Sequence, residues 1–162
     1  VHVFDKHAKP GGLLRYGIPD FKLEKQHIDR RVAQLSAEGV RFVTGCSVGV
    51  DITVAELRRS SDAVLLACGA LDSRDTPSTP GRRLRGVHLA MEYLVGANRH
   101  VAGLVGAAPV SAAGKQVVII GGGDTAADCL GVAHRQGAAG VPSADEYSWH
   151  WICQRSCLHG CC

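Results

Sequence analysis

A glycine-rich turn at residues 121–126 has the composition and spacing of a loop that binds phosphate groups. Gly121, Gly123 and Ala126 fit the pattern G-x-G-x-x-G/A, directly after the apolar run QVVII and at the start of a helical pattern. In such a loop the first glycine permits the sharp turn, the second leaves room for a pyrophosphate, and the small third residue lets the helix lie close to the strand. Free N–H groups at the helix start and the helix dipole favour the phosphate charge. The sequence therefore predicts a dinucleotide-binding turn, with a plain strand-to-helix turn as the alternative.

The residues that would choose between NADP and NAD are not evident after this turn. A dinucleotide unit normally carries an acidic residue, or an arginine for a 2′-phosphate, about 20 residues after the glycines. Here the sequence continues with GVPSADEYSW, in which Pro142 interrupts a central strand and no basic cluster follows. The sequence leaves the nucleotide selectivity open.

Asp5 is a second candidate ligand, because it closes the strand pattern VHVF at the start of the chain. An acidic residue in that place normally accepts hydrogen bonds from an adenosine ribose, about 20 residues after a glycine loop. As an isolated feature, an aspartate after a strand is more often a turn residue. Both roles stay open at this point.

Four of the seven cysteines fall in the last ten residues, in a tail with no helical or strand period. One interpretation is a metal site, because thiolate and imidazole groups are zinc ligands, although the spacing matches no paired C-x-x-C pattern. We favour a disordered end, or the product of a reading-frame change. The candidate ligands in the tail are Cys153, Cys157, Cys161, His150 and His159.

Strand patterns alternate with helical patterns along the chain. Apolar spacing predicts a helix at residues 24–38 that ends at Gly39, and Thr53 with Glu56 forms a capping box for a helix at residues 54–60. The continuous run AVLLAC at residues 63–68 predicts a strand buried on both faces. Further strands are expected at residues 1–4, 40–44 and 116–120, and further helices at residues 88–98 and after the glycine turn. This alternation predicts an α/β fold with parallel sheets.

Composition excludes several classes of function. The 162 residues carry 18 Lys and Arg against 15 Asp and Glu, a net charge of +3 without clustering, which favours neither nucleic acid nor a membrane surface as partner. No apolar run approaches the roughly 20 residues of a membrane-spanning helix, and the start has no signal or transit pattern. We expect a cytoplasmic protein.

Four blocks of the sequence together resemble the small (beta) subunit of bacterial glutamate synthase: KPGGLLRYGIPDFKLEK, RFVTGCSVGVDI, AVLLACGA and VVIIGGGDTAADC. The resemblance runs from residue 1 to about residue 139, with the blocks in family order. It implies Rossmann-like dinucleotide-binding folds in which an FAD domain is interrupted by an inserted NADPH domain. In the intact family two iron-sulfur clusters lie upstream, and the motifs for their cysteine ligands are absent here.

The resemblance also implies roles for particular residues. Asp5 would hold the FAD ribose, Gly11, Gly12 and Leu13 would pass beside the flavin and its phosphates, and Lys22 would approach the cofactor. Val48 would touch the adenine through its backbone, and Gly69 would form the turn beneath the FAD. The residues implied to line the NADPH phosphates are Gly121, Gly123, Asp124, Thr125 and Ala126. No catalytic side chain is expected, because the cofactor carries the hydride chemistry.

We therefore expect two partial domains: a partial FAD-binding domain at residues 1–85 and a partial NADPH-binding domain at residues 86–140, followed by a divergent, disordered Cys-rich tail at residues 141–162. In the leading hypothesis the chain is a fragment of a glutamate synthase small subunit, an NADPH-dependent oxidoreductase that passes electrons from NADPH through FAD to a glutamate-forming large subunit. The isolated fragment is expected to be inactive. The alternatives are another NADPH-dependent flavin reductase of the same group, or a non-catalytic truncated product.

Overall fold

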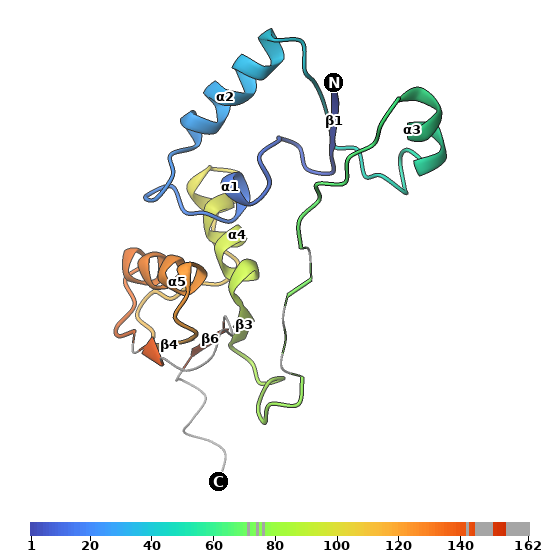
Figure 1. Cartoon of the computed structure of the whole chain (residues 1–162). Helices are drawn as coiled ribbons and strands as arrows, with labels where there is room; N and C mark the ends of the chain where they lie inside the picture. The colour runs from blue at the N-terminus through green and yellow to red at the C-terminus, as the bar shows by residue number, and fades with distance from the viewer. Residues whose placement is uncertain (71, 74, 76, 142, 145–150, 155–162) are drawn as a thin grey trace. The chain divides into compact units, whose positions relative to one another are not determined.

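The computed structural model describes all residues except 71, 74, 76, 142, 145–150 and 155–162, and for residues 143–144 and 151–154 it describes the backbone alone (Figure 1). Contacts within the chain divide it into two units. Unit 1 comprises Val1–Arg15 and Asp20–Leu71, and unit 2 comprises Tyr16–Pro19 and Asp72–Cys162. The chain therefore passes between the units three times.

Unit 1 is built on two parallel strands, β1 (His2–Asp5) and β2 (Arg41–Thr44), paired in register from His2 opposite Arg41 to Asp5 opposite Thr44. Parallel neighbours need a long crossover connection. Here the crossover contains the short helix α1 (Gly12–Tyr16) and the longer helix α2 (Lys25–Ala37). The predicted strands at both positions are confirmed.

Two of the three helices of unit 1 form where the sequence predicts them, whereas the short helix α1 is not among the predicted elements. In α2, Ile28 is buried, and Gly39 follows the helix with φ +94°, a left-handed conformation that glycine adopts at low cost. Helix α3 (Val54–Ser60) begins with the expected capping box: Thr53 Oγ1 accepts from Glu56 N at 3.2 Å, and Glu56 Oε2 accepts from Thr53 N at 2.8 Å. The Thr53 hydroxyl also donates to Glu56 Oε2 at 2.7 Å, and this bond, together with the one from Thr53 N, lowers the pKa of the Glu56 carboxyl.

Unit 2 contains a four-stranded sheet in the order β3-β6-β4-β5, with helices α4 (Ala90–Val101) and α5 (Asp124–Arg135) (Figure 1). Strands β4 (Val117–Ile120) and β5 (Ser143–Ala144) run parallel, whereas β6 (Trp151–Gln154) is antiparallel to both β4 and β3 (Val87–Leu89). The expected α/β class with parallel pairing is confirmed, although this sheet is mixed.

The core of unit 2 lies between α4, α5 and β4. Its largest fully buried side chains are those of Tyr93, Leu94, Val117 and Cys129. Alternate residues of β4 are buried, and α5 places Ala126, Cys129 and Ala133 toward the same core at helical spacing. Small residues on this face of α5 let the helix pack close to the strand.

The buried strand predicted at residues 63–68 is wrong. The structure has no strand there, and Val64, Leu65 and Leu66 are exposed, Leu65 by 89% and Leu66 by 81%. A continuous apolar run forms a central parallel strand only when neighbouring strands and covering helices reach it. Among the described residues β1 and β2 pair with each other alone, so this run has no strand partner.

Two strands lie in the Cys-rich tail, where the sequence predicted no regular structure. They are β5 and β6, and β6 fills the position between β3 and β4. Of the candidate metal ligands only Cys153 is described, and His150, Cys157, His159 and Cys161 lie outside the described residues. The disorder of the tail as a whole, and the predicted domain boundaries, stay predictions.

No helix in the described part of the chain is both long and apolar enough to cross a membrane. The same residues contain no group of three or more His, Cys, Asp or Glu side chains arranged to hold a metal ion.

Candidate dinucleotide-binding site

The glycine turn joins β4 to α5, and its glycines serve different purposes. Gly121 is buried and has φ +121°, which a side chain would strain. Gly123 is the N-cap residue of α5 with φ −82° and ψ −178°, an extended conformation that any residue adopts. The backbone conformation therefore requires glycine at position 121. At position 123 the backbone would accept any residue, and glycine matters there only because it has no side chain. That is the distribution expected of a turn that leaves space for a phosphate.

The start of α5 is open to a ligand. The first intrahelical hydrogen bond runs from Ala127 N to Gly123 O at 3.1 Å, and no side chain caps the helix. The preceding N–H groups, those of Asp124 to Ala126, have no intrahelical partner. Gly123 and Asp124 are exposed while Ala126 is 5% exposed and packs in the core. Donors at a helix start, with the positive end of its dipole, suit a pyrophosphate.

Asp5 acts as a turn residue in unit 1. Its Oδ1 accepts a hydrogen bond from His7 N at 2.9 Å, and its carbonyl accepts one from Cys46 N at 3.0 Å, just after β2. This geometry matches the turn role that the sequence left open. The carboxylate retains its second oxygen as an acceptor, so a role in binding ribose stays a prediction.

The loop at residues 11–13 is held in a tight conformation. Gly11 has φ +128°, and a Cβ there would lie 3.1 Å from Ile28 Cγ2 and 3.2 Å from Arg15 Cβ. Arg15 fixes the loop, because its Nε donates to Pro10 O at 2.7 Å and its Nη2 contacts Asp29 Oδ1 at 2.6 Å. Gly12 begins α1 with φ +48°, and Leu13 is 62% exposed.

The remaining predicted FAD contacts lie on separate segments of unit 1. Lys22 is exposed between α1 and α2, Val48 forms an isolated bridge with Ile52 after β2, and Gly69 is exposed with φ +70°. The structure thus places all seven predicted FAD residues in unit 1 and all five predicted NADPH residues in unit 2. Their roles in binding stay predictions.

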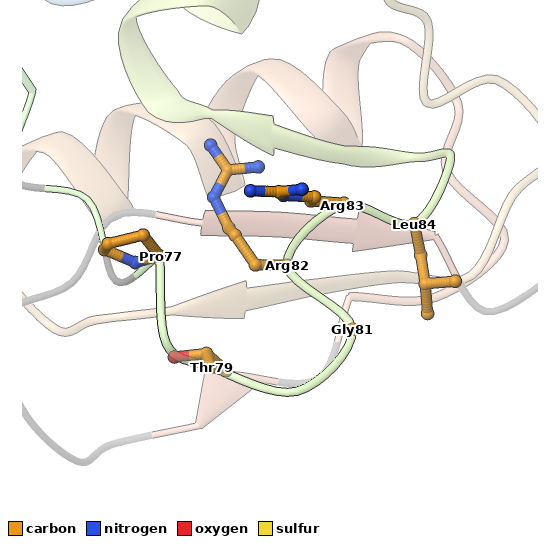
Figure 2. Close-up of a pocket in the computed structure, with 6 residues that line it drawn as sticks. All are labelled: Pro77, Thr79, Gly81, Arg82, Arg83 and Leu84. Atoms are coloured by element: carbon orange, nitrogen blue, oxygen red, sulfur yellow. The ribbon is translucent and has the colours of Figure 1, made fainter.

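A separate pocket of about 320 Å³ lies in the loop before β3 and includes none of the predicted residues. Figure 2 shows Arg82 and Arg83 at neighbouring positions of this loop, with Leu84 pointing away from them. Arg82 is held by Asp75, with 2.7 Å between Nε and Oδ1, while Arg83 is exposed. The pocket is lined by Pro77, Thr79, Gly81, Arg82, Arg83 and Leu84.

Two polar residues of unit 2 have structural roles that the sequence did not indicate. Gln136 Oε1 accepts from both Tyr93 Oη at 2.8 Å and Ala112 N at 2.9 Å, which joins α4, α5 and the segment before β4. Asn98 on α4 is 7% exposed and donates to backbone carbonyls more than 80 residues earlier. The sequence signal that could have identified Asn98 is that it is a single amide side chain on the apolar stripe of α4, which includes Tyr93, Leu94 and Ala97.

Burial makes Cys129 an unreactive thiol. It is 1% exposed, and burial, with a smaller contribution from the nearby Asp128 charge, raises its pKa from about 9 to about 12. Burial likewise raises the pKa of Tyr93. A cysteine in these surroundings serves packing rather than chemistry.

We expect Cys129 to react with iodoacetamide at pH 8 at least about 100-fold more slowly than the exposed Cys68, as measured by peptide mass spectrometry. Because the folded pKa is raised, the thiol's contribution to stability is complete below pH 9 and is lost as the pH rises through about 12. Equal labelling rates for the two cysteines in the folded chain would contradict the described core.

No family model matches the chain. Curated proteins do: it is 56% identical over 146 residues to the glutamate synthase [NADPH] small chain of Mycobacterium tuberculosis, a match that covers 87% of this chain and 30% of that protein. The resemblance to glutamate synthase small chains is confirmed. The small chain of Bacillus subtilis is 46% identical over 143 residues, with 87% and 29% of the two chains covered. The chain therefore spans about 30% of the length of these small chains.

A further relative carries NADH rather than NADPH in its name. Glutamate synthase [NADH] of Schizosaccharomyces pombe is 41% identical over 145 residues, which cover 87% of this chain and 7% of that protein.

Among solved structures, FprA from Mycobacterium tuberculosis in complex with NADPH matches with a TM-score of 0.69 and 22% identity, over 88% of this chain and 35% of FprA. At that identity the match shows the fold alone. It confirms that the α/β arrangement described above is the one found in an NADPH-binding oxidoreductase.

Proposed function

We propose that the chain is part of an NADPH-dependent electron-transfer protein of the glutamate synthase small-chain type. Unit 2 would bind NADPH, unit 1 would contribute to FAD binding, and electrons would pass to a large subunit that forms glutamate from 2-oxoglutarate and glutamine in the cytoplasm. The observation that carries the proposal is the 56% identity to the Mycobacterium tuberculosis small chain. Because the chain spans about 30% of that protein, the activity of the whole belongs to this proposal.

The open start of α5 fits the pyrophosphate of a nicotinamide dinucleotide. Gly123 presents no side chain, and the N–H groups of Asp124, Thr125 and Ala126 are the donors that would hold the phosphate oxygens. The Asp124 carboxylate is exposed in the first helical turn, so it can point into solvent rather than toward the phosphates.

In unit 1 the parallel pair β1 and β2 brings two predicted FAD contacts to one edge. Asp5 ends β1 and Val48 lies four residues beyond the end of β2, so both follow the carboxyl ends of neighbouring parallel strands. Ligands of open α/β sheets bind at this edge. The carboxylate of Asp5 would accept from a ribose hydroxyl, and the backbone at Val48 would meet the adenine.

When bound, the flavin would supply the redox chemistry, in which it accepts hydride and passes on single electrons. The residues of this chain bind and orient the nucleotides. This division of labour agrees with a site made of glycine turns and backbone donors rather than of side-chain acids and bases.

A pair of Asp5 variants tests the FAD part of the proposal and separates the two roles of this residue. Asp5→Asn keeps an oxygen that accepts from His7 N, whereas Asp5→Ala removes both the turn contact and the ribose acceptor. We expect both variants to weaken FAD binding about tenfold in a fluorescence titration, as loss of a charge-assisted hydrogen bond predicts.

A loss of FAD affinity in Asp5→Ala alone would show that the residue only shapes the turn. Unchanged affinity in both variants, or no FAD binding by the unmodified chain, would contradict the FAD part of the proposal. The NADPH affinity serves as the control, because Asp5 lies in unit 1 and the glycine turn in unit 2.

A further inference from the structure

The loop at residues 46–52 of unit 1 is closed by hydrogen bonds between its first and last residues. Asp51 Oδ2 accepts from Ser47 N at 2.7 Å, and Asp51 N donates to Ser47 O at 2.8 Å. Gly49 N donates to Ile52 O at 2.7 Å. Asp51 thus holds both polar backbone groups of Ser47, and its carboxylate is the side-chain group that closes the loop.

These bonds determine which way the polar backbone groups of Val48 point. Ser47 O and Gly49 N both point into the loop, toward Asp51 and Ile52. In a trans peptide the C=O and the following N–H point in opposite directions, and the described residues contain no cis peptide bond. The N–H and C=O of Val48 therefore both point out of the loop. No hydrogen bond within the described part of the chain uses either group.

A donor and an acceptor that point the same way from one residue match a nucleobase edge on which an acceptor lies beside a donor. The Watson–Crick edge of adenine has this arrangement, because its amino group lies beside an unprotonated ring nitrogen. Hypoxanthine reverses it, since a carbonyl replaces the amino group and the ring nitrogen carries a hydrogen. A base held in one register would thus form two hydrogen bonds as adenine, and would place like groups against each other as hypoxanthine.

The loop begins beside the residue proposed to hold the ribose. Cys46 N donates to Asp5 O at 3.0 Å, which ties the start of the loop to the end of β1. Helix α3 begins directly after the loop, at the capping box of Thr53. Both ends of the loop are therefore fixed by other contacts, and the bond from Ser47 N to the Asp51 carboxylate sets the path between them.

We propose that Asp51 is a positioning residue for nucleobase selectivity: its carboxylate closes the loop, so that Val48 presents its N–H and C=O together to the edge of an adenine. The inference rests on the proposed function, because the adenine is that of FAD. Asp51 acts through the backbone of Val48 and does not itself touch the cofactor. A site whose polar groups match one base rejects a base that reverses them, because the mismatched groups lose their partners.

The selectivity is measured by fluorescence titration of the full-length small chain that contains this sequence, freed of flavin. The two ligands are FAD and flavin hypoxanthine dinucleotide, the deaminated form of FAD. We expect the unmodified protein to bind FAD at least about tenfold more tightly than the deaminated form. In Asp51→Ala the preference should fall below about threefold, mainly through weaker binding of FAD. Asp51→Asn keeps an oxygen that accepts from Ser47 N, so it should restore the preference.

Asp62→Ala is the matched control, because Asp62 is also an exposed aspartate of unit 1 but lies outside the loop. Its preference for FAD should equal that of the unmodified protein. Closure of the loop is followed without flavin, by hydrogen–deuterium exchange of the peptide that covers residues 46–52. We expect exchange to be about tenfold faster in Asp51→Ala and unchanged in Asp51→Asn and Asp62→Ala.

A preference for FAD that survives in Asp51→Ala, or that is lost equally in Asp62→Ala, would overturn the proposal, as would unchanged loop exchange in Asp51→Ala. If the unmodified protein binds FAD and its deaminated form equally, the proposed function stands and the base selectivity is wrong. If it binds neither, the proposed function itself is wrong and the selectivity falls with it. If urea denaturation shows that Asp51→Ala is unfolded, Asp51→Leu, which also lacks the acceptor, is judged by the same criteria.

Discussion

Replacing Gly123 with valine should weaken NADPH binding by at least about 100-fold while α5 remains folded. The backbone at this position is extended, with φ −82° and ψ −178°, so valine introduces no strain there. Its branched side chain would instead occupy the space in front of the N–H groups that open α5. Loss of two hydrogen bonds to a charged phosphate, each worth about 1.5 kcal/mol or more, corresponds to about this factor.

Gly106→Val provides the matched control for this variant. Gly106 is also an exposed glycine of unit 2, its φ is not positive, and nothing lies within 4 Å of the position that a Cβ would take. NADPH affinity, measured by calorimetric titration, should be unchanged in Gly106→Val. If Gly123→Val binds NADPH normally, or if both variants lose affinity equally, the glycine turn is not the phosphate site.

The second large effect is on the free energy of unfolding, and it is expected in one of two leucine variants but not in the other. Leu94 is 1% exposed in the core of unit 2, so Leu94→Ala should lower the free energy of unfolding by about 2–5 kcal/mol through lost burial and the cavity left behind. Leu66 is 81% exposed, so Leu66→Ala should change it by no more than about 0.5 kcal/mol.

Urea denaturation of the two variants decides between the structure and the strand that the sequence predicts at residues 63–68. A buried strand would make Leu66→Ala as costly as Leu94→Ala. A cost of several kcal/mol at Leu66 would therefore contradict the exposed conformation, and a negligible cost at Leu94 would contradict the core of unit 2.

Capping residues and helical spacing were sufficient to predict the elements that depend on contacts between residues close together in the sequence. Three features form as predicted: the helix of unit 1 that Gly39 follows, the capping box of Thr53 and Glu56, and the helix after the glycine turn. Each depends on contacts within a few residues, and such contacts can be read from spacing.

Features that depend on distant partners could not be predicted in this way. The apolar run at residues 63–68 has the composition of a buried strand, but a strand exists only where a neighbour pairs with it. Strand β6 has no alternation in its sequence WICQ and owes its place to pairing with β3 and β4. Asn98 reads as a single polar residue in a helix until the structure shows the carbonyls of residues 16–18 beside it.

In the candidate site, too, the part built from contiguous residues was predicted from spacing, and the part built from distant segments was not. The glycine turn was predicted in full, including the close packing of Ala126, because strand, turn and helix are contiguous. The predicted FAD contacts come from segments spread between residues 5 and 69, and the resemblance to glutamate synthase small chains, rather than spacing, brought them together. In the structure these seven residues all lie in unit 1, and their roles in FAD binding stay predictions.

The most direct test of the proposed function is anaerobic mixing of NADPH with an FAD-loaded, full-length small chain that contains this sequence, with the flavin absorbance followed in time. The account predicts that the absorbance bleaches as the flavin is reduced, and that Gly123→Val bleaches at least about 100-fold more slowly at NADPH concentrations below saturation. A chain that binds both nucleotides without bleaching, or that binds neither, would contradict it.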